Sequence, residues 1–195
     1  MKNVGRKAYH AAGGLVLLGI YHFLAPRQAF AVYASLLAVL LLFDLARLRL
    51  PAFNTWALER MGTLMRPGEA GTITGSPAYV VGEALTLFLF DLPVATAAVL
   101  FLAFGDVAAT LVGESWGRTK FRGKSAEGTA AFVVAGFIAG AAPHLVGIGV
   151  ALPILAAGVI TAAIVEVTEP LGLNDNLSIP LSAAAVMTLL GRLFG

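Results

Sequence analysis

Residues 92–113 read LPVATAAVLFLAFGDVAATLVG, and this stretch decides how the chain folds. A helix needs roughly 20 mainly apolar residues to cross the hydrocarbon core of a bilayer, and this run is long enough. Asp106 is its single charged residue and lies in its second half. The stretch therefore predicts a membrane-spanning helix that carries an acid near one end.

The composition of the whole chain agrees with a membrane protein. Of its 195 residues, 58% are hydrophobic and 12% are charged, so the apolar side chains cannot all be hidden inside a soluble fold. The chain has no cysteine, which excludes disulfides, thiolate metal sites and a cysteine nucleophile. A net charge of +2, with basic residues in short clusters between apolar runs, argues against nucleic-acid binding.

The same length criterion, applied outward from this stretch, predicts seven membrane-spanning helices in one domain covering residues 1–195. Their expected ranges are 9–25, 28–43, 72–90, 92–113, 128–147, 150–170 and 178–194. The segment 44–71 is too polar to cross, yet its leucines and aromatic residues alternate with arginines. It is expected to form an amphipathic helix at the membrane surface. The predicted fold class is thus all-α, a polytopic membrane helical bundle.

Lysine and arginine residues are unevenly distributed over the connections of this seven-span model. One side carries Lys2, Arg6, Lys7, Arg47, Arg49, Arg60, Arg66, Arg118, Lys120, Arg122 and Lys124. The other side carries only Arg27 and Arg192, so the positive-inside rule predicts a cytoplasmic N terminus and an active site facing the cytoplasm. A cleaved signal peptide ending near Ala29 is the less favoured alternative, because Pro26 and Arg27 interrupt the required pattern.

A polar block at residues 105–129 interrupts the apolar sequence. Asp106 is expected about 12 Å below the membrane surface, where a carboxylate costs at least about 2.5 kcal/mol without a partner. Gly105 beside it lacks a side chain and would allow a ligand to approach closely. The alternative is a structural acid paired with a neighbouring helix.

The rest of the block suits phosphate binding. Gly113 and Gly117 punctuate a loop that contains Arg118 and Lys120, although a cytoplasmic loop would also be basic for topology alone. The next helix opens with Lys124, Ser125, Ala126, Glu127, Gly128 and Thr129. A capped helix N terminus presents free N–H groups and binds anions. Glu127 does not suit an anion site by itself, but it would if a divalent cation bridged it to phosphate.

Two further clusters complete the candidate site. Glu166, Asp175 and Asn176 offer the oxygen ligands that magnesium selects, although Asp175 would also serve as a turn and helix cap. At the N terminus, Arg6 and Lys7 are adjacent, and His10 lies four residues after Arg6 on the first helix. These three side chains would contact phosphate. Glu83, near the middle of the third span, fits a site acid and a structural partner equally well.

Taken together, these residues resemble the polyprenol kinase family, the CTP-dependent membrane enzymes that include dolichol, phytol and farnesol kinases. The resemblance covers most of the chain and is most specific in the central block. It is carried by Arg6-Lys7, His10, Thr74-Gly75, Tyr79, Gly105-Asp106, Gly113, Gly117, Lys124-Ser125, Glu127-Gly128-Thr129, Glu166, Asp175-Asn176-Leu177 and Pro180. Val107 and Glu114 depart from the pattern, where a small residue or proline and a basic residue are expected.

The resemblance implies transfer of the terminal phosphoryl group of a nucleoside triphosphate, typically CTP, to the hydroxyl of an isoprenoid alcohol. Lys124, Arg118 and Lys120 would then bind phosphates, Asp106 would orient or deprotonate the alcohol, and Glu127, Glu166 and Asp175 would hold Mg²⁺. The prenyl tail would stay in the lipid, beside the small residues of the fifth span. Those small residues would equally allow close helix packing.

Two other classes of function stay open. A CTP-dependent lipid cytidylyltransferase would use the same cytosolic site but act on a phosphorylated lipid and release pyrophosphate. A small transporter would use Glu83, Asp106 and Glu166 as a polar path, but it would not need the helix opening at 124–129. The expected partners are a nucleotide, a lipid alcohol and membrane lipids, not nucleic acid, and the sequence leaves open whether the chain forms a homodimer.

Overall fold

The stretch that begins at Leu92 forms one continuous helical rod with an irregular middle. It consists of α5 (Leu92–Leu100), a π-helical turn η3 (Phe101–Gly105) and α6 (Asp106–Ser115). Pro93 lies in the first turn of α5, where the missing N–H is not needed. A π turn holds one residue more than an α-helical turn, and such turns are frequent at functional sites. Asp106 follows this turn directly.

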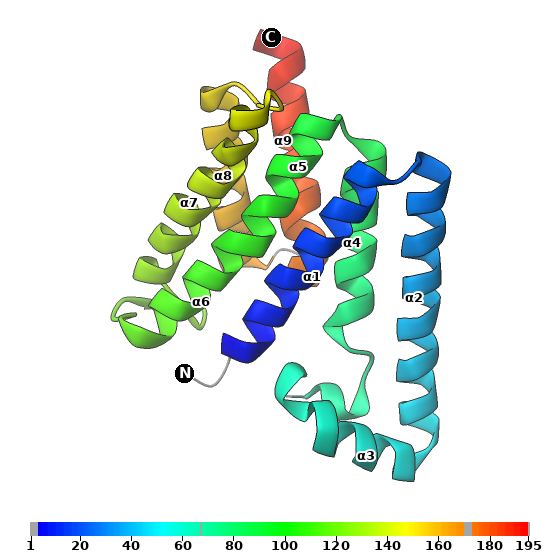
Figure 1. The fold of residues 1–195 in the computed structure, drawn as a ribbon. Helices are drawn as coiled ribbons and strands as arrows, with labels where there is room; N and C mark the ends of the chain where they lie inside the picture. Colours follow the sequence, from blue (N-terminus) through cyan, green and yellow to red (C-terminus); the bar gives the residue numbers. More distant parts are fainter. Residues whose placement is uncertain (1–3, 67, 170–172, 195) are drawn as a thin grey trace.

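The computed structural model describes residues 4–66, 68–169 and 173–194, and helices form most of it (Figure 1). The other α-helices are α1 (Val4–Phe23), α2 (Pro26–Arg49), α3 (Pro51–Met61), α4 (Gly75–Leu89), α7 (Ala126–Ala141), α8 (Leu152–Thr168) and α9 (Asp175–Phe194). Short 3-10 turns are η1 (Gly62–Leu64), η2 (Glu69–Gly71) and η4 (Ala142–Val146). Each of the seven predicted spans corresponds to one long helical segment, so the all-α prediction is confirmed.

The segment predicted to lie on the membrane surface differs in one respect from the expectation. α2 does not stop near residue 43 but continues to Arg49, and only then does the chain turn. Leu50 is extended because Pro51 follows it, and Pro51 starts α3. α3 runs across the lower end of the bundle, in a different direction from α2 (Figure 1). The separate helix expected in the range 44–71 is therefore confined to its middle part, Pro51–Met61.

Large residues on the π turn pack against glycines of the neighbouring helices. Phe101 is fully buried, and a Cβ added to Gly140 of α7 or Gly158 of α8 would meet its ring. A Cβ at Gly136 would lie 2.8 Å from Val159 of α8. These glycines therefore serve helix packing. This contact fixes the position of the rod that carries Asp106.

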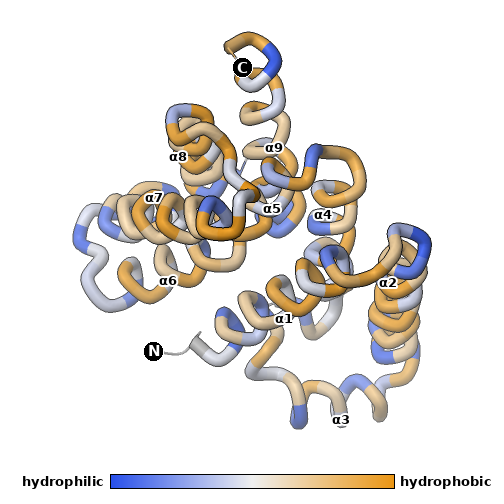
Figure 2. Tube along the Cα trace, turned by 45° about the horizontal axis from the view of Figure 1, so that its top comes forward, coloured by the Kyte–Doolittle hydropathy of each residue, from blue (hydrophilic) through white to orange (hydrophobic). Residues whose placement is uncertain are grey.

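The outer surface is suited to lipid. Among the described residues, four helical segments are long and apolar enough to cross a membrane: Pro26–Arg49, Leu92–Ser115, Ala126–Val146 and Asp175–Phe194. In the first of these only 17% of the apolar window is buried, so most of its hydrophobic side chains face outward. Figure 2 shows apolar residues along the helices and polar ones mainly at their ends. The start of α1 and the end of α9 lie at opposite ends of the bundle (Figure 1), while the number of spans and their direction stay predictions.

The basic loop after α6 is a small hairpin. β1 (Lys120–Phe121) pairs with β2 (Lys124–Ser125) in antiparallel register, with Phe121 opposite Lys124. The two turn residues, Arg122 and Gly123, both have positive φ, as a two-residue hairpin turn requires. The hairpin returns the chain to α6, so that Ser125 can begin α7 beside it.

Candidate active site

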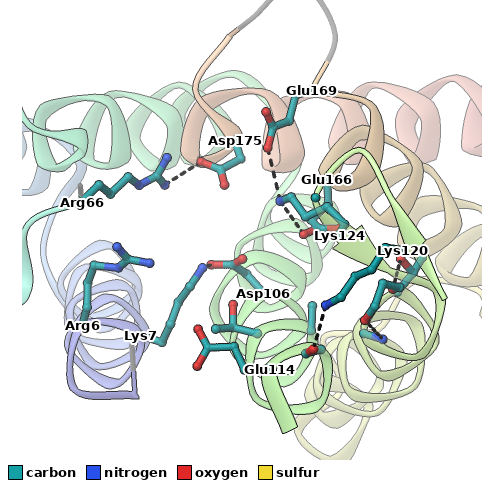
Figure 3. A pocket seen from close by; sticks show the side chains of 17 residues that line it. Arg6, Lys7, Arg66, Asp106, Glu114, Lys120, Lys124, Glu166, Glu169 and Asp175 are labelled. Carbon is teal, nitrogen blue, oxygen red and sulfur yellow. Dashed lines mark hydrogen bonds and ion pairs between the residues drawn. The ribbon is translucent and has the colours of Figure 1, made fainter. Parts of the chain in front are cut away.

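A cavity of about 570 Å³ opens at the end of the bundle that carries the hairpin. Its wall combines the first turns of α1, α7 and α9, one face of α6 along its length, the end of α8, the hairpin, and the segment before α4 (Figure 3). The lining residues are Arg6, Lys7, Arg66, Asp106, Ala109, Thr110, Gly113, Glu114, Lys120, Gly123, Lys124, Ser125, Gly128, Thr129, Glu166, Glu169 and Asp175. Segments that are far apart in the sequence thus bring their charged residues to one place.

Asp106 lies in the cavity wall and forms an ion pair with Lys7 of α1. Both side chains are only 9% exposed. Since each charge would be costly alone at this depth, the pair explains how both are tolerated. The acid expected near the end of the fourth span therefore faces polar groups, and its nearest cation comes from the first helix.

Lys124 joins the hairpin to the end of α8. Its Nζ lies 2.6 Å from Oε1 of Glu166 and 3.3 Å from Oε1 of Glu169. Burial by itself lowers the pKa of Lys124, but the hydrogen bond and charge of Glu166 outweigh it and raise the pKa above the usual lysine value. Lys124 therefore carries its positive charge into the cavity throughout the physiological pH range.

Arg66 reaches the cavity from the segment between α3 and α4. Its Nη2 donates to Oδ1 of Asp175 at the start of α9, at 2.7 Å. Burial lowers the pKa of Arg66, but the charge of Asp175 and the hydrogen bond to it raise the pKa above the usual arginine value. Figure 3 shows this pair on one side of the cavity and the Lys124 group on the other.

The start of α7 has the predicted helix cap. Oγ of Ser125 accepts a hydrogen bond from the backbone N–H of Gly128 at 3.1 Å. Gly128 lets α7 approach α6 closely, since an added Cβ would lie 2.7 Å from the carbonyl oxygen of Ala109. Lys120 extends along the same wall, with its Nζ 3.4 Å from the carbonyl oxygen of Gly113. The predicted anion-binding residues that line the cavity in this part of the chain are Gly113, Lys120, Lys124, Ser125, Gly128 and Thr129, whereas Gly117 and Arg118 are not among its lining residues.

The charges that line the cavity are balanced. Five cations (Arg6, Lys7, Arg66, Lys120 and Lys124) face five acids (Asp106, Glu114, Glu166, Glu169 and Asp175). A triphosphate would add several negative charges to a lining that has no net charge, so a metal cation entering with it would restore the balance. Oε2 of Glu166 is buried and has no hydrogen-bond partner among the described residues.

These observations fit a magnesium ion that arrives bound to a nucleotide. Among the residues that the structure describes, no group of three or more histidine or acidic side chains is arranged to hold a metal by itself. Magnesium bound to phosphates needs only one or two protein carboxylates, because phosphate oxygens and water complete its shell. Glu166, Asp175 and Asp106 are the acids in position to supply them.

Several predicted site residues lie outside the cavity wall. Glu127 turns back to the loop, where its carboxylate accepts hydrogen bonds from the backbone N–H groups of Arg118 and Thr119 at 3.1–3.3 Å. This contact gives Glu127 a structural task, and it needs no bridging metal. A Cβ at Gly117 would meet the side chain of Ser125, so this glycine permits the loop to pack against the start of α7.

Three more predicted site residues make contacts within the protein in place of the predicted ligand contacts: Gly105, His10 and Asn176. A Cβ on Gly105 would lie 2.9 Å from the ring of Phe132, so its missing side chain makes room for the helix neighbour and not for a ligand. The imidazole of His10 packs edge-on against Tyr79, at 5.1 Å between ring centroids. Asn176 is 2% exposed, and its Nδ2 donates to the carbonyl oxygen of Gly75 at 3.4 Å. It connects α9 to α4.

Glu83 lies apart from the cavity, buried between α4 and α2. Tyr33 of α2 donates to its Oε1 at 3.5 Å, and its Oε2 has no partner among the described residues. Glu83 is absent from the described lining, which favours the structural interpretation of this acid.

Three charged lining residues were not among the predicted phosphate-binding, metal-binding or catalytic residues: Arg66, Glu114 and Glu169. Arg66 looks like any other positive-inside charge, and only the return of the chain from α3 to α4 brings it to Asp175. Glu169 follows α8 with a positive φ of 43°, and this left-handed cap turns the chain where its carboxylate meets Lys124. The close spacing of Glu166 and Glu169 was the available signal.

Comparison with known proteins adds independent information. The chain is 32% identical over 139 residues to a CTP-dependent diacylglycerol kinase of Eremothecium gossypii, covering 69% of this chain and 44% of that protein. The Saccharomyces cerevisiae protein of the same name is 29% identical over 145 residues, covering 69% and 48%. A phytol kinase of Synechocystis is 28% identical over 191 residues, covering 94% of this chain and 77% of that enzyme.

The extent of these matches differs between the two kinds of relative. The chain spans less than half the length of the two diacylglycerol kinases but most of the phytol kinase. No family model matches the chain, and no solved structure matches it. The resemblance expected from the motifs is nevertheless confirmed as a sequence similarity to lipid kinases, namely to proteins named CTP-dependent diacylglycerol kinase and to a phytol kinase.

Proposed function

We propose that the protein is a membrane-embedded lipid kinase that transfers the terminal phosphoryl group of CTP to a lipid hydroxyl. The observation that carries this proposal is the cavity, in which five cations and five acids meet at the end of an otherwise apolar bundle. Phosphoryl transfer depends on positioning and charge neutralisation, and this lining offers both. Two relatives named CTP-dependent support CTP as the donor.

The proposed reaction has one bond formed and one broken. The lipid hydroxyl oxygen attacks the γ-phosphorus, the bond from that phosphorus to the β,γ-bridging oxygen breaks, and CDP leaves. Asp106, which lines the cavity at the start of α6 and falls within the fourth predicted span, accepts the hydroxyl proton. Lys124, Lys120, Arg6 and the N terminus of α7 bind the phosphates. Glu166 and Asp175 would hold a magnesium ion that enters with the nucleotide, and this ion would supply positive charge beside the phosphates.

The acceptor that we propose is an isoprenoid alcohol. The relative that matches nearly the whole chain is named phytol kinase, and the match extends over 94% of this chain. Diacylglycerol is the second candidate acceptor, favoured by relatives that match 69% of the chain. Both substrates carry a hydroxyl at the end of a hydrocarbon body, so the same cavity chemistry would serve either.

The test uses purified protein in mixed micelles, γ-labelled CTP and magnesium, with farnesol, phytol, a long polyprenol or diacylglycerol as acceptor. Label in an isoprenoid monophosphate supports the full proposal. Label only in phosphatidic acid retains the lipid kinase but replaces the acceptor. If label instead appears in pyrophosphate when a phosphorylated lipid is supplied, the protein is a cytidylyltransferase and the kinase proposal fails. CTP labelled at the α-phosphate provides the matched control for that outcome.

A further inference from the structure

Two apolar hollows adjoin each other on the side of the bundle where α1 faces α2. One, of about 350 Å³, is lined mainly by apolar residues of α1, α2 and α4. The other, of about 190 Å³, continues toward α3 and the end of the bundle. Both include Tyr9, His10, Leu40 and Ser76 in their walls, so they form one depression. We name this depression the α1–α2 groove.

The groove ends at the polar cavity. Arg66 lines both the cavity and the end of the groove nearest to α3. α1 also faces both: Arg6 and Lys7 contribute to the cavity, while His10 and Gly13, further along the helix, line the groove. A molecule lying along α1 would therefore pass from apolar walls to phosphate-binding cations within about two helical turns.

The position of the groove indicates its occupant. The outward surface of α2 is apolar and mostly unburied, as expected of a helix in contact with lipid. A groove open beside such a helix excludes charged ligands and accepts a hydrocarbon chain. An occupant that also reaches Arg66 must carry a polar group at one end.

We propose that the α1–α2 groove binds the hydrocarbon chain of the acceptor lipid, with its hydroxyl end directed past Arg66 toward Asp106. This assignment rests on the proposed kinase function and specifies where its acceptor lies. It also gives His10 a place beside the lipid chain and not on a phosphate. Two of the small residues of α7, the helix considered above as a tail site, instead face neighbouring protein, because Gly136 and Gly140 pack against Phe101 and α8.

Gly13 offers a direct way to block the groove. It lines the groove, and a Cβ added there would meet no atom within 4 Å. A leucine at this position would project into the groove without displacing the protein around it. Gly19 is a matched control, because it lies on the same helix, has equally open space at its Cβ, and is absent from the described groove lining.

The experiment compares Gly13→Leu and Gly19→Leu with the unmodified protein in the micellar kinase assay. The expected result for Gly13→Leu is a rise of about tenfold in the KM for the lipid acceptor, with the KM for CTP unchanged. Gly19→Leu is expected to keep both values. Equal acceptor KM values in all three proteins, or the same rise in both variants, would overturn the assignment.

A second measurement works without turnover. An alcohol with a photoreactive diazirine in its hydrocarbon tail is irradiated with each protein, and the modified peptides are identified by mass spectrometry. Labelling of α1 and α2 residues of the groove that Gly13→Leu removes and Gly19→Leu keeps supports the assignment, even if no acceptor is phosphorylated. Labelling on α7 and α8 alone would reject it. The absence of phosphorylation together with groove labelling would reject the kinase function and keep the lipid site.

Discussion

Asp106 owes its position to two neighbours from other parts of the chain. The ring of Phe132 occupies the space beside Gly105, and Lys7 supplies the charge that compensates the buried carboxylate. The local sequence predicts how deep the acid lies in its span, but it does not reveal either neighbour. Residue spacing therefore predicted that Asp106 needs a partner, and the packing of α1 against α6 determines which partner it has.

Replacing Asp106 with asparagine tests its role as the proton acceptor. Asp106→Asn keeps the size of the side chain but removes its basicity, so turnover is expected to fall by at least about 100-fold. CTP binding should persist, because Lys7 is then free to contact phosphate. The measurements are kcat with saturating acceptor and the Kd of a fluorescent CTP analogue. Asp91→Asn, at the far end of the rod, is the control and should retain activity.

Glu166 is the acid whose second oxygen lacks a partner, which makes it the best test of metal binding. Glu166→Gln should increase the magnesium concentration required for half-maximal activity by about tenfold. The loss of a residue that positions a metal commonly lowers metal affinity or activity by about 10–100-fold. Magnesium titrations at fixed CTP give the result. Glu59→Gln on the exposed face of α3 should leave the titration unchanged. An unaltered magnesium requirement in Glu166→Gln would remove this residue from the metal site.

At the scale of elements, the segment between α3 and α4 is held in place by a buried arginine. Arg47, 1% exposed, pairs with Asp44 at 2.7 Å and donates to the carbonyl oxygens of Ala70 and Thr72. Asp44 in turn accepts hydrogen bonds from the N–H and the hydroxyl of Thr74. This network ties α2 to the segment that carries Arg66. In the sequence, Arg47 counted only as one of the basic residues that indicate topology. The sequence alone does not reveal which arginine becomes buried.

Removing this arginine should loosen the whole segment. Arg47→Ala leaves Asp44 buried without its cation, which is expected to destabilise the protein by about 3 kcal/mol or more. Thermal unfolding in detergent, followed by circular dichroism, should show a clearly lower Tm. Arg49→Ala, two residues further on and exposed, should unfold like the unmodified protein. Similar Tm values for the two variants would show that the network contributes little to stability.

At the scale of the whole molecule, apolar runs were enough to predict a helical segment at each of seven places, because a membrane helix must satisfy its backbone within itself. Their boundaries shifted where capping or proline decides them, as at Pro51 and Ser125. The candidate site was predictable as a set of residues near one end. Which of these residues line the cavity was not predictable, because Gly105 and Glu127 look equivalent to their neighbours until helix packing and loop hydrogen bonds are known.

The orientation in the membrane can be tested directly, because the chain contains no cysteine. Single cysteines at Phe121 in the hairpin and Leu145 after α7 replace residues that are 60% and 90% exposed. A membrane-impermeant maleimide added to intact spheroplasts should label Leu145→Cys alone, since the positive-inside rule assigns the hairpin to the cytoplasm. In inverted vesicles the hairpin cysteine should react instead. The opposite pattern would reverse the predicted topology.

The π turn at Phe101–Gly105 separates the length of the helical rod from the rotation of α6 about its axis. Removing one residue from it would rotate α6 relative to α5 by about 100° but shorten the rod by only about 1.5 Å. The fit of the rod to the bilayer depends on its length, while the meeting of Asp106 with Lys7 depends on its rotation. An insertion or deletion in this turn would therefore redirect the face of α6 that carries Asp106 while leaving the length of the rod almost unchanged.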